Sequence, residues 1–507
     1  MIKKIFSYKI STATFFSLII SFIYFLIVVI ISGKHEFWGD EINTWLAVRD
    51  MAKPELLKFM LWDGHPILHY MVFSIFADLG LTLHSVQLFF CLISAAGIFI
   101  LYRFCSFPLW IKTIITFSPA MLYYYPIMLR NYVYIPPLIF SLISIFPYAL
   151  RGRFLSSDLT ENSFACTERK QKILFAIFCL LTVILSATHA VMLPFSAGIF
   201  AILLFYFIKK KDSIPVSSFE ITALAISGLI IAATALQLII CRGNNPMLGS
   251  FPANNFVQFM KLAASFFTNH ASDFVSVPTP GKFILDAGII AVLILFASAS
   301  VYLIRTNLTA AFIFLFSLFG YLFIFFSSYS IIFPYRTYSM LFVLAAALHI
   351  SSYLNKNSHH INVGLVSLSL LFLIGYPSGF AMLAEDFKKP FSTGKDMADY
   401  INRNIPENDN TILITSYPNS VITVAYHLGE RKILMGCKQR AFVMNWSEKY
   451  ENDFSCFEDS AKTFYFVFPY TYEIYPELTV GGRKFHLEYY SKPAVKFQEN
   501  FALYKMD

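Results

Sequence analysis

The chain has 507 residues, of which 57% are hydrophobic, 18% are aromatic and only 14% are charged. A soluble globular protein carries about 25% charged residues, so this composition excludes that class and indicates a protein that crosses a membrane many times. The formal net charge of +8 does not predict a nucleic-acid partner, because the Lys and Arg residues fall in short clusters between apolar runs rather than along one face.

Apolar runs of a length suited to crossing a bilayer, about 17–25 residues, follow one another as far as residue 380. The first follows a short basic stretch and is too long for a signal-peptide core, so we expect it to remain as a first span whose start is cytoplasmic. We therefore expect a mainly α-helical transmembrane domain over residues 1–380. The eleven predicted spans are residues 10–32, 84–102, 111–128, 132–150, 173–188, 191–208, 218–240, 283–304, 308–329, 337–354 and 361–380.

A twelfth apolar run, residues 67–81, decides the topology. It has only fifteen residues, contains Asp78 and follows a Gly-His-Pro break. If it does not cross, fifteen of the Lys and Arg residues outside the C-terminal region are cytoplasmic and nine are external; if it crosses, the numbers become eight and sixteen. Because basic residues favour the cytoplasmic side, we predict that residues 67–81 form an interfacial or re-entrant helix within a first external loop, residues 33–83.

The first external loop carries two adjacent carboxylates, Asp40 and Glu41, directly after Trp38 and Gly39. An Asp beside the membrane surface can accept a proton from a hydroxyl group, and a neighbouring Trp can make it more basic by excluding water. The alternative is that the two carboxylates cap a surface helix. These residues alone do not decide between the two interpretations.

Other polar residues fall on the same predicted side. Asp63 and His65 precede Pro66 and either orient a substrate, bind a metal or form a simple turn. His189 lies in a tight turn between two spans, where it is a turn residue or a ligand. Arg130 and Arg336 are isolated guanidinium groups at the external ends of spans. They suit a lipid-linked phosphate or pyrophosphate, or they reach to ordinary lipid head groups.

The composition changes to that of a soluble protein in the C-terminal region, residues 381–507. Residues 393–404 have helical spacing, and residues 411–415, 463–468 and 485–489 have the character of strands. We expect a small extracytoplasmic α/β domain, placed on the external side of the membrane by the odd number of spans. Cys437 and Cys456 fall in this region and can form a disulfide there if the compartment is oxidising, a point that the sequence leaves open.

The motifs, taken in order, resemble those of a known family. A W-x-D-E loop at 38–41, an H-P turn at 65–66, an R-x-Y turn at 130–132, an H-A turn at 189–190 and a Pro-x-Arg-x-Tyr motif at 334–338 follow one another. This arrangement resembles the GT-C glycosyltransferases, and within them the bacterial branch of the dolichyl-phosphate-mannose protein mannosyltransferase and aminoarabinose transferase superfamily. The resemblance implies a GT-C fold with about eleven transmembrane helices, interfacial helices in the first external loop and a second large external loop, residues 242–282.

The resemblance also implies roles for the site residues. Asp40 matches the general base, with Glu41 as its companion in the catalytic pair, and His65, Arg130, His189 and Arg336 match residues near the sugar or the carrier phosphate. We expect Asp63 and Tyr132, which neighbour His65 and Arg130, to help bind the substrate or lipid phosphate. One departure concerns metal binding. Many relatives carry an Asp shortly after the second-loop Arg, whereas here Arg130 is followed by Asn-Tyr-Val-Tyr-Ile-Pro-Pro. A second carboxylate, and any divalent metal that it would hold, are therefore left open.

By this resemblance the protein is an inverting glycosyltransferase in the bacterial inner membrane. It would move a sugar from a polyprenyl-phosphate donor to a hydroxyl of an envelope glycan or lipid on the periplasmic face. The sequence has no nucleotide-binding loop, which fits a lipid-borne donor. The alternatives are an O-antigen polymerase or ligase and a non-catalytic flippase of lipid-linked saccharide; a flippase would favour charged residues at the midplane or repeated broken helices. The sequence does not reveal the sugar, the acceptor or the oligomeric state.

Overall fold

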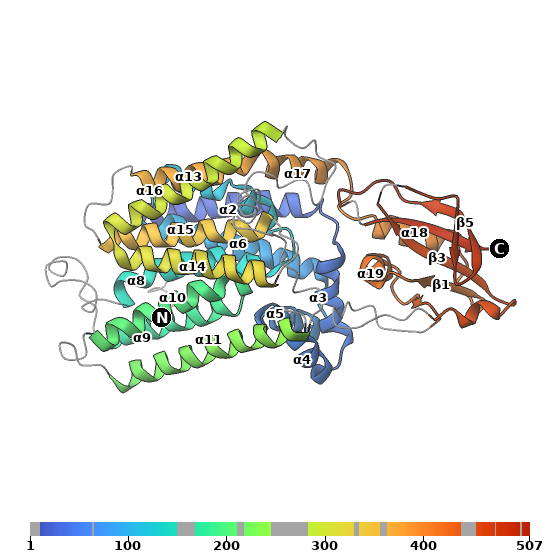
Figure 1. The fold of residues 1–507 in the computed structure, drawn as a ribbon, viewed down its shortest axis with the longest axis horizontal. Helices are drawn as coiled ribbons and strands as arrows, with labels where there is room; N and C mark the ends of the chain where they lie inside the picture. The colour runs from blue at the N-terminus through green and yellow to red at the C-terminus, as the bar shows by residue number, and fades with distance from the viewer. Residues whose placement is uncertain are drawn as a thin grey trace, which may run out of the picture.

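The computed structural model describes residues 11–62, 65–149, 168–209, 217–244, 282–328, 334–354, 362–437, 453–471, 473–496 and 499–507. Asp63 and nearly all of the predicted loop 242–282 lie outside these residues. Arg336 lies in a described helix, but its side chain is not part of the description. Figure 1 shows a long helical bundle with a smaller sheet-containing domain at one end.

The bundle confirms the predicted class of a mainly α-helical, multi-pass membrane protein. Among the described residues, eight helical segments are long and apolar enough to cross a membrane. These eight, together with α9, α14 and an irregular segment described below, coincide with all eleven predicted spans. The helices are α2 (Thr12–Ser32), α6 (Leu83–Phe104), α8 (Ile135–Ala149), α9 (Glu168–Ser186), α10 (Leu193–Lys209), α11 (Ser218–Asn244), α13 (Lys282–Thr306), α14 (Leu308–Ser328), α15 (Pro334–Leu354), α16 (Val363–Ile374) and α17 (Tyr376–Lys388).

The first span illustrates how the helices are built for a lipid environment. Helix α2 starts at Ser11, whose hydroxyl accepts a hydrogen bond from the backbone N–H of Thr14. Tyr24 and Val28 face the neighbouring helices and are buried, whereas Phe22 and Ile30 point outward and are exposed. An apolar outer surface is the stable arrangement in a bilayer, where lipid replaces water as the solvent.

One predicted span is not a regular helix. The sequence predicts a span at 111–128, but the segment consists of α7 (Leu109–Thr116) and a π-helical turn, η1 (Ala120–Tyr124), with Pro119 between them. Proline interrupts the backbone hydrogen bonds of a helix, and the freed carbonyl groups need partners inside a membrane. Hydroxyl groups from neighbouring segments supply them, because Tyr24 donates to the carbonyl of Met121 and Tyr376 donates to that of Ile114.

Three short helices form the first loop at the end of the bundle that faces the C-terminal domain (Figure 1): α3 (Gly39–Asp50), α4 (Lys53–Trp62) and α5 (Leu68–Asp78). Helix α5 has 11 residues and is therefore about 16 Å long, too short to cross the hydrocarbon core. It packs against α3, with Phe73 near Trp45 in a common core. The structure thus places residues 67–81 as a short helix within this loop.

The C-terminal domain is the predicted α/β unit, and it begins where α17 ends, at Lys388. Its single sheet has the strand order β2-β1-β3-β6-β5-β4. Strand β1 pairs in parallel with β2 and β3, and the remaining pairs are antiparallel. The strands are β1 (Thr411–Thr415), β2 (Ile433–Met435), β3 (Thr463–Tyr470), β4 (Glu477–Val480), β5 (Arg483–Tyr490) and β6 (Asn500–Met506).

Both faces of this sheet are covered, which the alternation of side chains along β3 explains. Tyr465 and Val467 pack with α18 (Gly394–Asn404) and α19 (Pro418–His427) on one face. Phe464 and Phe466 belong to a second core on the other face, which also contains Phe457 from the short helix η5 (Ser455–Glu458). The predicted helix at 393–404 and the predicted strands are therefore present.

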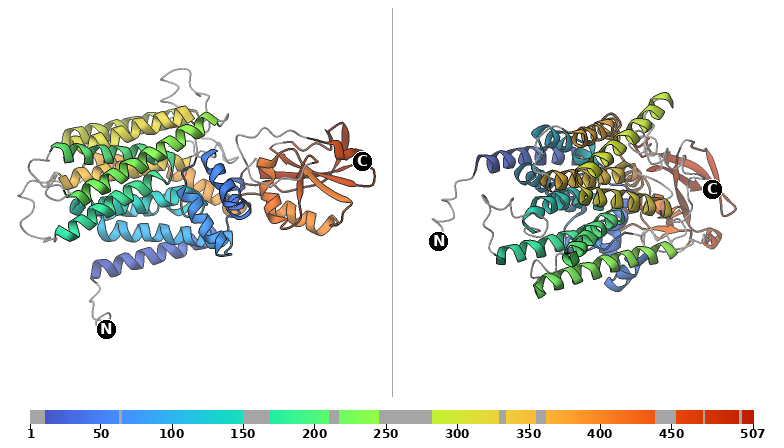
Figure 2. Two further views of the ribbon diagram at one scale, coloured as in Figure 1. Left: turned by 90° about the horizontal axis from the view of Figure 1, so that it is seen from below. Right: turned by 60° about the vertical axis from the view of Figure 1, so that its left-hand side comes forward.

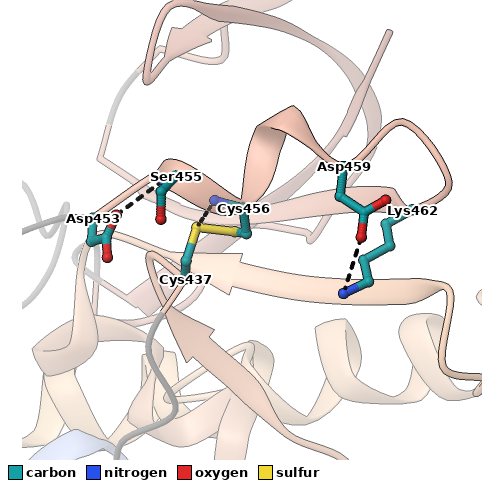
Figure 3. The surroundings of a disulfide bond; sticks show 6 residues. All are labelled: Cys437, Asp453, Ser455, Cys456, Asp459 and Lys462. Carbon is teal, nitrogen blue, oxygen red and sulfur yellow. Dashed lines mark hydrogen bonds and ion pairs between the residues drawn. A yellow bond between two sulfur atoms is a disulfide. The ribbon is translucent and has the colours of Figure 1, made fainter.

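A disulfide joins Cys437, two residues after β2, to Cys456 in η5 (Figure 3), with 5.6 Å between the two Cα atoms. The structure thereby decides the pairing that the sequence leaves open. A disulfide is expected in an oxidising compartment, which agrees with the predicted placement of this domain outside the cytoplasm.

The C-terminal domain docks on the first loop, which lies beside it in the left view of Figure 2. Helix α19 packs against α3, and Ile422 of α19 is part of the same apolar core as Ile42, Trp45 and Leu46 of α3. The helix that carries Asp40 and Glu41 is therefore held between the bundle and the C-terminal domain.

Candidate active site

Asp40 and Arg130 form an ion pair at the junction of the first loop with the bundle. Asp40 lies in the first turn of α3, and Arg130 is the residue directly before the 3-10 turn η2 (Asn131–Tyr134). A carboxylate oxygen of Asp40 is 3.1 Å from a guanidinium nitrogen of Arg130. The Asp40 side chain is 23% exposed and that of Arg130 is 9% exposed. The carboxylate is thus both held by a cation and accessible to a ligand.

His65 continues this arrangement from the H-P turn. Its Nε2 atom is 3.4 Å from the second terminal nitrogen of Arg130. The backbone of the turn is held by Gln237 of α11, whose side-chain amide donates to the carbonyl groups of His65 and Met60 at 3.0 and 3.2 Å. Arg130 therefore lies between a carboxylate and an imidazole that come from two different parts of the first loop.

Tyr132 and His189 lie next to this pair and are fully buried. The backbone N–H of Val191 donates to Nδ1 of His189, so the neutral ring carries its proton on Nε2. That Nε2 donates to the hydroxyl oxygen of Tyr132 at 2.7 Å, and the rings of His65 and His189 are 5.6 Å apart. We call the five residues Asp40, His65, Arg130, Tyr132 and His189 the arginine cluster.

Glu41 has surroundings that differ from those of Asp40, although the two are adjacent. Its side chain is fully buried and accepts hydrogen bonds from the backbone N–H groups of Trp38, at 3.0 Å, and Leu129, at 2.7 Å. The bond to Trp38 is one half of a capping box, in which the side chain of the third helical residue accepts a hydrogen bond from the backbone N–H of the residue just before the helix. Glu41 therefore joins the start of α3 to the segment that carries Arg130.

His35 connects Glu41 to the last transmembrane segment. Its two ring nitrogens lie 3.4 Å from Glu41 and 2.9 Å from Asp386 of α17, and Tyr123 donates to the same oxygen of Asp386 at 2.7 Å. Burial alone would lower the pKa of His35, but the two carboxylates outweigh burial and raise its pKa to about 10. His35 is thus a buried cation at neutral pH. We call His35, Glu41, Tyr123 and Asp386 the buried network.

Two charged residues of the C-terminal domain, Lys496 and Glu499, contact Trp38 and Gly39 at the start of α3. Glu499 accepts a hydrogen bond from the backbone N–H of Gly39 at 2.8 Å. The ammonium nitrogen of Lys496 lies 3.3 Å from Glu499 and 3.4 Å from the centre of the Trp38 ring, while the guanidinium carbon of Arg130 is 6.0 Å from that ring. Trp38 thus lies near two cations, one from each domain.

An apolar groove of about 640 Å³ lies between α10, α11 and α14. Its lining includes Leu193 and Pro194, four and five residues after His189, and only apolar residues line it. Gly228 permits the close packing of one wall, because a Cβ atom there would lie 2.6 Å from the Phe200 ring. The groove is therefore an apolar surface, and two of its lining residues are close in sequence to the arginine cluster.

The structure brings together the predicted residues Asp40, His65, Arg130, Tyr132 and His189, which come from four separate segments of the chain. Glu41 is next to Asp40 in the chain, but its side chain points into the buried network. Asp63 lies outside the described residues, and the Arg336 side chain is not described, so both stay predictions. Within the described ranges, no three His, Cys, Asp or Glu side chains are grouped so that they could hold a metal.

Sequence reasoning did not identify four residues that surround this site: His35, Asp386, Lys496 and Glu499. His35 and Asp386 have a weak signal, since each is a charged residue within a few positions of the end of a span. Lys496 and Glu499 have none, because their contact with Trp38 and Gly39 exists only once the C-terminal domain has docked on the first loop.

Comparison with known proteins gives one structural likeness of nearly full length. No protein-family model matches the sequence, and no curated protein matches it. Among solved structures, the chain is similar to ArnT from Cupriavidus metallidurans in a crystal structure with bound undecaprenyl phosphate. The sequences are 10% identical, the TM-score is 0.49, and 97% of each chain is covered.

Proposed function

We propose that this protein is an inverting glycosyltransferase that uses a polyprenyl-phosphate-linked sugar. It transfers the sugar to a hydroxyl group of an envelope glycan or lipid on the external face of the bacterial inner membrane. The observation that carries the proposal is the ion pair of Asp40 with Arg130, a partly accessible carboxylate 3.1 Å from a guanidinium group. Such a pair offers a base and an anion-binding group side by side.

In the proposed reaction the two groups act on different partners of one displacement. Asp40 acts on the acceptor hydroxyl that attacks, and Arg130 acts on the phosphate that leaves. The acceptor oxygen attacks the anomeric carbon while Asp40 takes the acceptor proton, and the bond from that carbon to the phosphate oxygen breaks. The configuration at the anomeric carbon inverts because attack and departure occur on opposite faces of the sugar. Arg130 stabilises the negative charge that grows on the departing phosphate, and Arg336 of α15 is proposed to assist it.

The ion pair has a consequence for the order of events. The guanidinium group of Arg130 is shared between Asp40 and His65. A lipid phosphate that binds Arg130 competes with Asp40 for it, which leaves the carboxylate free to accept a proton. Binding of the donor would therefore activate the base, and the enzyme would have little reactivity toward the acceptor alone.

The apolar groove supports a lipid-borne donor rather than a soluble one. A long isoprenoid chain needs an apolar surface in contact with the bilayer, and a groove of about 640 Å³ lined only by apolar residues supplies one. Leu193 and Pro194, which line the groove, are four and five residues after His189 in the chain, and we propose that a carrier whose hydrocarbon lies in the groove has its phosphate at the arginine cluster.

The proposal can be tested with the purified protein in lipid nanodiscs. A polyprenyl-monophosphate sugar and an envelope extract from cells that lack the protein are added, and the products are identified by mass spectrometry. The expected result is a sugar-bearing envelope glycan or lipid and a free polyprenyl phosphate. Transfer only from pyrophosphate-linked oligosaccharides would instead indicate an O-antigen polymerase or ligase. Movement of the donor across the bilayer without transfer would indicate a flippase.

A further inference from the structure

The C-terminal domain contacts the start of the helix that carries Asp40. Gly39 is the first residue of α3, and its backbone N–H donates to Glu499 at 2.8 Å. The first N–H groups of any helix have no partner within the helix and must find one elsewhere. Here Glu41 holds the N–H of Trp38, and Glu499 holds the next one. One of the two carboxylates belongs to the helix, and the other belongs to a different domain.

Glu499 and Lys496 are themselves held firmly. The backbone carbonyl of Glu499 accepts from the N–H of Thr393 at 3.1 Å, and the N–H of Lys496 donates to the carbonyl of Phe391 at 3.0 Å. The Phe391 ring lies 4.7 Å from His35 and 6.2 Å from Trp38. The two charged side chains are therefore anchored on a segment that packs against both the buried network and Trp38.

Both side chains are mostly withdrawn from water, so their charges act strongly on near neighbours. The Glu499 side chain is 3% exposed and that of Lys496 is 13% exposed. Burial raises the pKa of the Glu499 carboxyl, while Lys496 and the Gly39 N–H act in the opposite direction. An ionised pair in this position forms a local dipole one residue away from Asp40. Exposed ion pairs on the same domain, such as Lys484 with Glu477, are screened by solvent.

We propose that Lys496 and Glu499 are positioning residues for Asp40, and that the C-terminal domain thereby contributes to the active site. Glu499 fixes the direction of the first turn of α3 through Gly39, and Lys496 holds Trp38 in place against it. The opposite charges of the two side chains also act on the ionisation of Asp40, in opposite directions. Neither residue touches the reacting atoms. This inference rests on the proposed function, because it assigns to Asp40 the role of base.

The opposite charges of the two residues provide the test. Glu499→Gln keeps an oxygen that can accept from Gly39 but removes a negative charge near Asp40, so the acidic limb of the profile of kcat/KM against pH moves to lower pH. Lys496→Met removes a positive charge, so the limb moves to higher pH. A shift of about half a pH unit in each direction corresponds to a threefold change in the fraction of ionised base. A purely structural role would not produce shifts of opposite sign.

The other charged groups that face Asp40 stay unchanged in both variants. Among the described residues, these groups are Arg130 with His65 behind it, and the buried pair of Glu41 and His35 at the start of the helix. Matched controls are Glu477→Gln and Lys484→Met, whose side chains are 51% and 68% exposed on β4 and β5. Both controls should leave the limb in place. Shifts of the same sign, or no shift, in the two test variants would overturn the electrostatic part of the proposal.

A second measurement does not depend on transfer activity and so separates this inference from the proposed function. In the full-length protein, hydrogen exchange of the peptide that contains Gly39 and Asp40 is followed by mass spectrometry. Glu499→Ala should speed exchange there about tenfold relative to Glu477→Ala, because the Gly39 N–H loses its acceptor. Unchanged exchange would contradict the positioning role. Faster exchange in a protein without transfer activity would keep the positioning role and remove the proposed function alone.

Discussion

Asp40 and Glu41 are adjacent in the chain but belong to two regions with opposite properties. Asp40 faces the arginine cluster, is 23% exposed and has a cation within reach of a ligand. Glu41 points into the buried network, where two backbone N–H groups and His35 surround it. The difference follows from helix geometry, because successive residues in the first turn point about 100° apart. One turn of helix thus carries both a candidate base and the carboxylate that holds this base in place.

The arginine cluster is expected to give the largest effect on activity. Arg130→Met removes the cation that the proposed phosphate needs, and loss of one such group costs about 10²–10³ in kcat. Arg130→Lys keeps the charge without the bidentate geometry and should lose less. Initial transfer rates in nanodiscs measure both. The control is Arg49→Met, an Arg in the same loop with a side chain that is 46% exposed. Equal rates in Arg130→Met and Arg49→Met would contradict a role in the reaction.

The buried network is expected to affect stability instead. Glu41→Gln leaves the His35 cation with only one carboxylate and puts an amide group next to the N–H of Trp38 or Leu129. Removing one partner of a buried, hydrogen-bonded charge pair costs about 2–4 kcal/mol. Thermal unfolding in detergent should therefore begin at lower temperature than for Glu55→Gln, an exposed Glu on α4. The transfer rate per folded molecule should fall by less than about threefold. A loss as large as that of Arg130→Met would contradict the assignment of the buried network to stability rather than to the reaction.

The protonation of His35 gives the buried network a pH dependence. Its pKa in the folded protein is about 10, above the value of about 6.5 in an unfolded chain. The charged ring therefore contributes its full stability below about pH 6.5 and loses it as the pH rises toward 10. We expect the unfolding temperature to fall by roughly 5 °C between pH 7 and pH 10. His35→Gln should lower the starting value and remove this part of the decline, whereas the exposed His84→Gln should retain it.

Tyr132 is expected to give the smallest change in free energy. Tyr132→Phe removes the hydroxyl group that accepts a hydrogen bond from His189, but it keeps the ring that stacks on Tyr125. Loss of one such bond costs about 1 kcal/mol, or roughly fivefold in rate if the imidazole is thereby misplaced. Tyr134→Phe is the matched control, because the Tyr134 hydroxyl has no hydrogen-bond partner among the described residues. Similar rates in the two variants would place Tyr132 outside the site.

The sequence was sufficient to predict the class of fold and the residues of the arginine cluster. Apolar runs and the distribution of Lys and Arg place Asp40, His65, Arg130 and His189 at one end of the bundle, and the structure brings them together there. The orientation of that end relative to the cytoplasm, and the catalytic roles, stay predictions. Hydropathy is a property of each segment by itself, so the spans can be predicted without knowing which segments are in contact.

The buried network could not be predicted, because it depends on contacts between distant segments. His35 and Asp386 are 351 positions apart and lie 2.9 Å from each other. Lys496 and Glu499 face Trp38 and Gly39 only through docking of the C-terminal domain. The segment at 111–128 was predicted as a transmembrane span because of its apolar content, but it is not one regular helix. Pro119 and Pro126 were the available signal, but the tyrosines that hold the broken backbone come from α2 and α17.

The most direct test of the division between the two carboxylates is the transfer rate per folded molecule of Asp40→Asn, measured beside Glu41→Gln and the exposed control Asp78→Asn. Folded protein is counted by gel filtration and thermal unfolding before the assay. We expect Asp40→Asn to unfold at the wild-type temperature and to lose at least about 10² in rate, because a general base contributes about 10²–10⁴. Glu41→Gln should lose stability and keep most of its rate. Wild-type transfer by folded Asp40→Asn would contradict the account.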